Sequence, residues 1–462
     1  MAGVGFQLRR LLRRGTFGDL GMAFVYAGTL AAGPWLVTVA TLVLLFVFVR
    51  PLLGLERFEL FSTSVMYAFA GSLILSGPWM MLSTRYAADQ MFLRRRDRIP
   101  AGVHASLALT AACALVVVGM LAAWSSWQDP EGQALAFRVL VGALLLVVAL
   151  VWIVLGTVSY ARWYRWVTGS FVLSGVLSLA GSWMLGKSMG PAGALGGYVL
   201  GFVVLLGCLY GLWRWRFGAG PAWDKRVFEA FRQWGPIAGV GLFYQLGVWA
   251  DKIVLWTLRG HPIGRTPLRA LPEYDILTFL AYLSIVPALS YFLIIVETEF
   301  FARYRTYLSS VRRGTLLTVW ESEGHLRQAL RRGLWRMAEY QAVTTLCLAV
   351  AAEPILTWLQ LSAWSAELFR VLLVAAGFQV LLLTVVLFLL YFELRWEACW
   401  VSVLFCVGNF VCTAAVARGP LPWLGMGYAV AVGLAFLVGV AWLELKMRRV
   451  TFLLFARQPV VD

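Results

Sequence analysis

The chain has 462 residues, of which 61% are hydrophobic and only 13% are charged, and its mean hydropathy is +0.78. A soluble domain carries roughly 25% charged residues, so this composition excludes an ordinary water-soluble protein. The formal net charge of +16 does not indicate a nucleic-acid partner, because the basic residues stand in short clusters between apolar runs rather than on one water-exposed face.

Apolar windows follow one another along the whole chain, and each is long enough to cross a hydrocarbon core of roughly 30 Å. They cover residues 24–48, 61–84, 102–124, 137–158, 166–186, 193–213, 236–258, 275–296, 338–361, 367–391, 397–417 and 423–445. We therefore expect an all-α polytopic membrane protein of about twelve transmembrane helices, arranged as two six-helix bundles.

The polar segments between the windows define the expected domains. These are a cytoplasmic amphipathic basic helix at 1–19, a first six-helix bundle at 20–217, a cytoplasmic linker at 218–235, a second six-helix bundle at 236–445 that includes a cytoplasmic loop at 300–336, and a cytoplasmic tail at 446–462.

Lysine and arginine gather on one side of the expected spans. With the N-terminus inside, the inner segments hold 29 of the 39 Lys and Arg residues and Lys252 lies within a span. The outer segments hold nine when Arg138 and Arg370, near the ends of their windows, are counted with them. Positive residues near the ends of spans stay on the cytoplasmic side. Both termini are therefore expected in the cytoplasm.

Reporter fusions test this topology. Fusions at residues 190 and 265 should be active in the periplasm, and fusions at residues 95 and 320 should be active in the cytoplasm. The topology is wrong if a residue assigned to the inside can be labelled from the outside of intact cells.

Two basic segments outside the spans are amphipathic. In residues 1–19 four arginines lie opposite an apolar helix face, and in the loop 300–336 eight arginines accompany an apolar stripe. Such a segment either rests on the anionic inner leaflet or docks a cytoplasmic partner. For the loop, the candidate docking residues are Arg327, Arg331 and Arg332.

Charged residues inside the windows are the main functional candidates, because each costs about 2.5 to 3.5 kcal/mol near the centre of a bilayer. Asp251 and Lys252 lie deep in window 236–258. Neighbouring residues on a helix point about 100° apart, so we expect the two not to neutralise each other. Two interpretations remain open: the residues line a hydrated translocation path, or Asp251 pairs with a basic residue of another helix and locks the bundle.

The other path candidates either accompany this pair or lie near the ends of spans, where charged groups can also reach the membrane surface. They are Tyr244, Gln245, Trp249, Arg85, Glu297, Glu299 and Glu353. Tyr244 and Trp249 offer apolar faces on which sugar rings can slide. Uncharged polar groups within spans, such as Gln379 and Asn409, more often form interhelical hydrogen bonds than bind ligands.

Signals of soluble enzymes do not occur in the sequence. It has no GxxxxGK[ST] loop for nucleotide phosphates and neither CxxC nor HxxxH spacing for a metal. We therefore expect no catalytic residues, no metal and no cofactor.

Several motifs resemble those of one family. They are the opening MAGVGFQLR, the Gly-Pro-Trp motifs at 33–35 and 77–79, TRYAAD at 84–89, WADKI at 249–253, and the stretch from Tyr274 to Phe300. Together they resemble the Pel exopolysaccharide transporters (PelG) from end to end. The resemblance implies the multidrug, oligosaccharidyl-lipid and polysaccharide exporter superfamily, whose members have two six-helix bundles that open alternately inward and outward.

The same resemblance implies a location, a cargo and partners. The chain is expected in the bacterial inner membrane, where it moves an exopolysaccharide to the periplasm for a biofilm matrix. The implied partners are a cytoplasmic glycosyltransferase and membrane subunits that sense cyclic-di-GMP and scaffold the complex.

Three other functions remain open: a small-solute or drug antiporter of the same fold, a flippase for a lipid-linked oligosaccharide, and a multispan glycosyltransferase or polymerase. The last would need acidic catalytic residues on a sizeable outer loop, and the expected outer loops are short. The chain is therefore expected not to be an enzyme.

Overall fold

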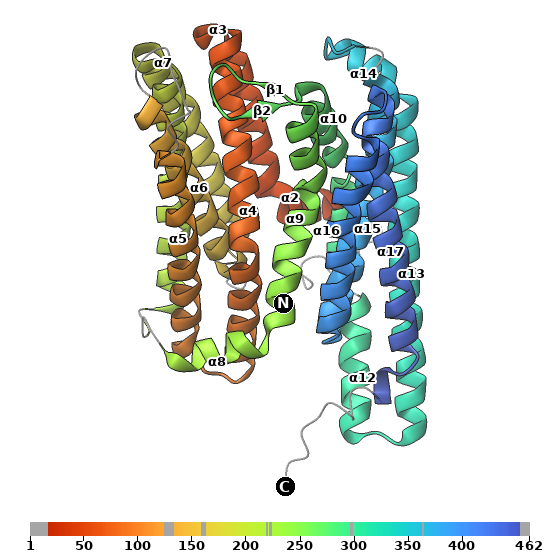
Figure 1. Ribbon diagram of the computed structural model, residues 1–462. Coiled ribbons are helices and arrows are strands. Elements are labelled where there is room, and N and C mark those ends of the chain that lie inside the picture. Colours follow the sequence, from red (N-terminus) through yellow and green to blue (C-terminus); the bar gives the residue numbers. More distant parts are fainter. Residues whose placement is uncertain are drawn as a thin grey trace. The chain divides into compact units, whose positions relative to one another are not determined.

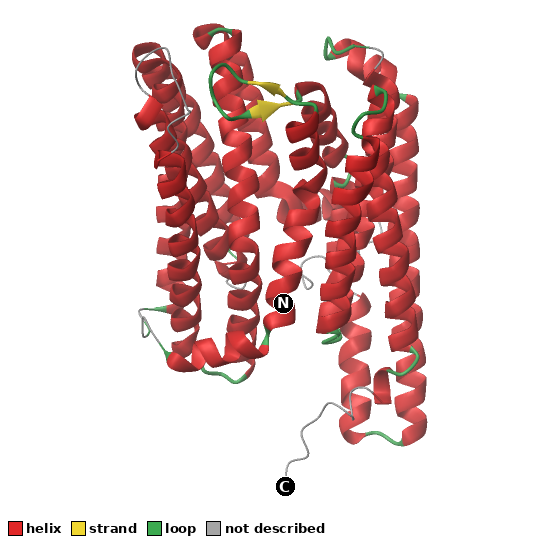
Figure 2. Cartoon of the chain, viewed as in Figure 1, coloured by secondary structure: helices red, strands yellow, loops and turns green. Residues whose placement is uncertain are grey.

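The computed structural model describes residues 17–123, 134–158, 163–218, 220, 224–295, 299–362 and 365–452. These residues are almost entirely helical, with one pair of short strands (Figures 1 and 2). The fold class expected from the sequence, an all-α polytopic membrane protein, is thereby confirmed. The amphipathic helix expected at 1–19 lies almost wholly outside the described residues, as does most of the tail at 446–462.

The chain forms two compact units, Gly33–Leu271 and Met1–Ala32 with Pro272–Asp462. We call them the 33–271 unit and the 272–462 unit. The division into bundles at 20–217 and 236–445 remains a prediction.

The 33–271 unit begins within the first long helix. In chain order its elements are α2 (Phe17–Phe48), which starts in the other unit, α3 (Arg50–Leu53), α4 (Leu55–Phe92), the 3-10 helix η1 (Arg96–Arg98), α5 (Ile99–Ala123), α6 (Ala134–Val158), α7 (Tyr164–Phe217), α8 (Lys225–Gln233), α9 (Gly235–Leu258), β1 (His261–Pro262) and β2 (Arg269–Ala270).

The 272–462 unit continues with helices only. Its elements are α10 (Pro272–Leu283), α11 (Val286–Ile295), α12 (Phe301–Arg313), α13 (Leu316–Val350), α14 (Ala352–Trp358), α15 (Ser365–Tyr391), α16 (Arg395–Val416), the 3-10 helix η4 (Leu421–Gly425) and α17 (Met426–Met447).

Each apolar window of the sequence coincides with a helix or with two consecutive helices. Within the described residues nine spans are long and apolar enough to cross a membrane, or ten if the bent pair α13 and α14 is one span. Helix α9, which carries Asp251 and Lys252, is not among them, and α7 contains two windows. The count of twelve spans and the side on which the termini lie remain predictions.

Helix α7 is in fact a hairpin of two helical arms. The chain breaks at Gly190, whose φ of 60° and ψ of −144° are accessible mainly to glycine. Serine side chains then join the arms: Ser174 Oγ donates to the Gly201 carbonyl over 2.9 Å, and Ser182 Oγ donates to the Ala194 carbonyl over 2.8 Å. Small residues of this kind let membrane helices approach closely, which explains why two windows fall on one helix.

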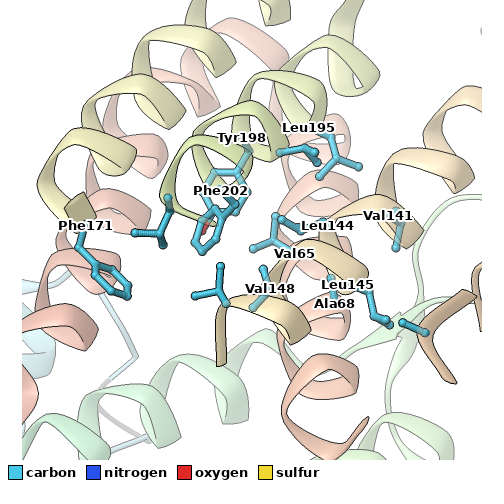
Figure 3. Close-up of a cluster of buried hydrophobic side chains, with 14 of the residues drawn as sticks. Val65, Ala68, Val141, Leu144, Leu145, Val148, Phe171, Leu195, Tyr198 and Phe202 are labelled. Carbon is cyan, nitrogen blue, oxygen red and sulfur yellow. The ribbon is translucent and has the colours of Figure 1, made fainter. Parts of the chain in front are cut away.

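The core of the 33–271 unit lies between α4, α6 and α7 (Figure 3). Val65 of α4, Leu144 and Val148 of α6, and Tyr198 and Phe202 of α7 are buried there. The Tyr198 and Phe202 rings lie 5.1 Å apart between centroids. Because lipid is as apolar as these side chains, close van der Waals packing rather than exclusion of water holds such helices together.

Strands β1 and β2 form an antiparallel hairpin that contacts the first turns of α4. The Tyr67 ring stacks on Trp256 at 4.4 Å, and its hydroxyl donates to the Arg269 carbonyl over 2.9 Å. His261 Nε2 lies 2.7 Å from Glu59 Oε1. The segment 259–271, which carries Arg259, Arg265 and Arg269, is therefore packed onto its own unit.

Helices α12 and α13 form a hairpin that turns at Gly314. Thr315 caps α13, because its Oγ1 accepts a hydrogen bond from the Thr318 amide over 3.4 Å. The apolar stripe expected in this segment is turned inward, with Leu326 and Met337 buried. That stripe thus packs within the protein and is not the face that a partner or lipid would contact.

Candidate functional site

Helix α9 is positioned by a close approach to α4. A Cβ on Gly241 of α9 would fall within 3.0 Å of both carbonyl atoms of Gly77, which precedes Pro78 in α4. Only glycine at both positions lets the two backbones come this close. The contact fixes the half of α9 that carries Tyr244, which is buried, and Gln245, which is partly buried.

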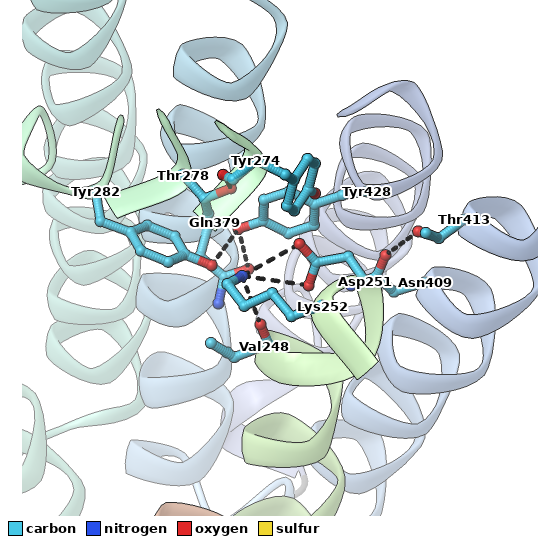
Figure 4. A network of polar contacts seen from close by, with 10 residues as sticks. All are labelled: Val248, Asp251, Lys252, Tyr274, Thr278, Tyr282, Gln379, Asn409, Thr413 and Tyr428. Carbon is cyan, nitrogen blue, oxygen red and sulfur yellow. Dashed lines mark hydrogen bonds and ion pairs between the residues drawn. The ribbon is translucent and has the colours of Figure 1, made fainter. Parts of the chain in front are cut away.

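The candidate site on α9 is the ion pair between Asp251 and Lys252, which are 0% and 5% exposed (Figure 4). Lys252 Nζ lies 3.1 Å from Asp251 Oδ2 and 3.4 Å from Oδ1. It also approaches the Val248 carbonyl at 3.5 Å and the centre of the Trp249 ring at 5.5 Å.

The expectation that these neighbours would not neutralise each other is wrong. Their Cα–Cβ directions diverge, but the flexible four-carbon stem of lysine carries its ammonium group back to the adjacent carboxylate. The pair is neutral as a whole, which lowers the cost of placing it within the membrane. Asp251 therefore has a basic partner on its own helix. The sequence had suggested a basic residue of another helix as the alternative to a hydrated path.

The Asp251–Lys252 pair can also bind a polar ligand through hydrogen bonds. A buried ion pair is weak evidence for stability, because desolvation of both charges offsets much of their attraction. The carboxylate oxygens can accept additional hydrogen bonds, and the ammonium group can donate up to three. The flat face of Trp249 beside the cation adds an apolar surface.

The 272–462 unit contains a second polar cluster, made by three helices (Figure 4). The Tyr428 hydroxyl of α17 donates to Gln379 Oε1 of α15 over 3.3 Å, and it lies 3.2 Å from the Tyr282 hydroxyl of α10. Since Tyr428 uses its single proton on Gln379, Tyr282 donates to Tyr428. Beside them in α10, Thr278 donates to the carbonyl of the buried Tyr274 over 2.8 Å.

Of this second cluster, the sequence indicated only Gln379, as an interhelical hydrogen bond, and its bond to Tyr428 confirms that expectation. Tyr282 and Tyr428 were missed. Tyrosines are common near membrane interfaces, so the sequence contains no signal that singles these two out. Asn409 of α16 accepts a hydrogen bond from Thr413 of the same helix over 2.9 Å.

Two of the remaining path candidates, Arg85 and Glu353, form ion pairs elsewhere. Arg85 pairs with Asp89 one turn along α4, with its Nε 3.2 Å from the carboxylate. Glu353 accepts a hydrogen bond from Arg370 over 2.8 Å and is largely exposed. Glu297 lies outside the described residues.

Glu299 lines a small polar cavity beside α12 and α13. Arg332 and Arg336 line it from α13, and Tyr291 lines it from α11. The Tyr291 hydroxyl is hydrogen-bonded to Arg336. Glu299 was expected to line the path and Arg332 to dock a partner, but both line this one cavity.

The other two docking candidates form ion pairs within the chain. Arg327 pairs with Glu323 and also donates to the Arg448 carbonyl over 3.1 Å. Arg331 pairs with Glu444 of α17. Both arginines therefore hold α13 against the end of α17, which makes them less available to a partner.

The buried phenol of Tyr307 also links α12 to Thr451, in the segment after α17. The Tyr307 hydroxyl of α12 lies 3.0 Å from Thr451 Oγ1, and Thr451 donates in turn to Glu323. Burial raises the pKa of Tyr307, with a smaller opposing effect from its hydrogen bond to Thr451. The phenol therefore stays protonated at any physiological pH.

The fold is shared with solved transporters of very different sequence. An outward-facing multidrug resistance MATE-family transporter of the MOP superfamily is 12% identical, with a TM-score of 0.66 over 96% of this chain and 98% of the other. An inward-facing MATE-family transporter is 13% identical, with a TM-score of 0.61 over 92% and 95%. A mutant of the Vibrio cholerae MATE transporter VcmN is 13% identical, with a TM-score of 0.64 over 93% and 98%.

The protein is thus a multi-pass membrane protein with a MATE-like fold. A search of curated protein sequences gives no match. The model of the PelG exopolysaccharide exporter family (EPS-E) matches residues 1–455, and the chain belongs to that family. The family resemblance found in the sequence motifs is confirmed.

Proposed function

We propose that this exporter moves a Pel-type exopolysaccharide from the cytoplasm to the periplasm across the bacterial inner membrane, within a complex that builds a biofilm matrix. The match of the family model to nearly the whole chain supports the proposal most strongly. The proposed partners are a cytoplasmic glycosyltransferase and membrane subunits that sense cyclic-di-GMP and scaffold the complex.

We assign the path to the polar and aromatic face of α9. A sugar polymer loses hydrogen bonds to water when it enters a membrane protein, and each unpaired polar group costs about 1 to 3 kcal/mol. The Asp251–Lys252 pair supplies charged acceptors and donors, Gln245 supplies an amide, and Tyr244 and Trp249 supply apolar faces. This combination suits a repeating chain of hydroxylated rings.

The Tyr282–Tyr428–Gln379 cluster supports the same assignment within the other unit. Its hydroxyl and amide groups exchange hydrogen bonds readily, because each tyrosine can act as donor or acceptor. These groups are uncharged, and neutral donors and acceptors of this kind match sugar hydroxyls.

The runner-up function is that of a small-solute or drug antiporter, which the shared fold with multidrug transporters favours. A deletion strain separates the two. Restoring the gene should restore secreted polymer without changing the minimal inhibitory concentrations of cationic drugs. Drug resistance that rises with the gene, in a strain that secretes polymer equally well without it, would contradict the proposal and support the antiporter.

A further inference from the structure

The turn of the α12–α13 hairpin carries large apolar side chains that the described residues leave uncovered. Leu316 and Leu317 are each 63% exposed, and Trp320 is 60% exposed. We call these three residues the hairpin tip. In water such a group is unfavourable, and exposed apolar patches usually mark an interaction site.

The hairpin tip lies far from the part of α13 that is expected to cross the membrane. Helix α13 is continuous from Leu316 to Val350, and its apolar window begins at residue 338. At about 1.5 Å per residue, the tip lies roughly 30 Å from the start of that window. Exposed apolar residues farther along, such as Val343 and Leu346, lie within the window, where lipid is expected to cover them.

The hairpin tip is held on a rigid base. Within the same unit, Arg331 pairs with Glu444 of α17, and Arg327 donates to the Arg448 carbonyl. The buried Tyr307 is linked to Thr451. A partner would therefore meet a preformed surface and lose little conformational entropy on binding.

The surroundings of the hairpin tip are basic. Exposed charged residues on α12 and the first turns of α13 are Arg303, Arg305, Arg312, Arg313 and Glu321. A partner that complements this surface would have an apolar cleft surrounded by acidic residues, because interfaces pair positive with negative patches. A second copy of the same surface would place arginines against arginines, which is unfavourable.

We propose that the hairpin tip is a docking surface for a water-soluble protein that inserts Leu316, Leu317 and Trp320 into an apolar cleft with an acidic rim. Arg312 and Arg313 face that rim. The site differs from the ion-paired Arg327 and Arg331, which hold the base of the hairpin. The docking proposal does not depend on exopolysaccharide being the cargo, because binding of the partner is measured separately from export.

Photo-crosslinking followed by a binding titration tests the proposal. A photoreactive amino acid is placed at position 317 or 320 of the full chain in cells that express its own operon, and mass spectrometry identifies the adduct. The identified protein is then purified and titrated against the full chain in detergent. Trp320→Ser, and separately Arg312→Glu with Arg313→Glu, should each weaken binding at least tenfold, and raising the salt concentration should weaken it further.

Trp335→Ser is the matched control, because Trp335 is 70% exposed on the same helix but lies near the apolar window. It should bind as the wild type does. Thermal unfolding of every variant should match the wild type, since the altered side chains are exposed. Adducts to lipid or to a second copy of the chain, no adduct at all, or binding unchanged by Trp320→Ser would each overturn the proposal.

Discussion

Neutralising both Asp251 and Lys252, as Asp251→Asn with Lys252→Gln, should reduce polymer export at least tenfold while the protein stays at normal abundance in the membrane. The two residues are buried and paired. Removing both charges together removes the whole ion pair, and the two new amides can hydrogen-bond to each other, so the double variant should lose less stability than either single variant. Secreted polymer and the amount of inserted protein are measured in the same cells.

The single variants serve as controls for stability. Asp251→Asn alone leaves Lys252 without its neighbouring carboxylate, and breaking a buried pair in this way costs about 3 to 5 kcal/mol. Both single variants should therefore be less abundant than the double variant. Normal export by the double variant would mean that the pair has a structural role and does not line the path.

Gly241→Ala should destabilise the protein by about 1 to 3 kcal/mol, the usual cost of forcing extra atoms into a packed contact. The added methyl would fall within 3.0 Å of the Gly77 carbonyl group, so α9 must move away from α4. Thermal unfolding in detergent and abundance in the membrane both report the loss. Export per molecule should fall as well, because α9 carries the ion pair.

Gly235→Ala, at the start of α9, is the matched control. A Cβ there meets nothing within 4 Å, so this variant should match the wild type in stability and export. If Gly241→Ala were equally harmless, the close approach of α4 and α9 would not be what positions the site.

The sequence predicted the helices well, because length and apolarity alone decide which segments can cross a membrane. It also indicated Asp251 and Lys252 through their cost in lipid. It did not predict that the two would pair, because that depends on side-chain torsions of Lys252. Nor could it predict the Tyr282–Tyr428–Gln379 cluster, which depends on how three helices rotate about their axes.

The arginines of the loop 300–336 show a similar limit of prediction from sequence. Their number indicated a binding surface, but Arg327 and Arg331 instead pair with Glu323 and Glu444. Sequence spacing suggests the first of these pairs, since its members are four residues apart. The second joins residues far apart in the chain and becomes visible only in the folded unit.

Export itself is measured most directly in sealed vesicles. The glycosyltransferase and the membrane subunits proposed as partners are reconstituted with and without this chain, and nucleotide sugar is supplied on the outside. The account predicts that polymer accumulates in the lumen, protected from added glycoside hydrolase, only in vesicles that contain the chain. Equal amounts of protected polymer without the chain, or polymer that stays outside in its presence, would contradict it.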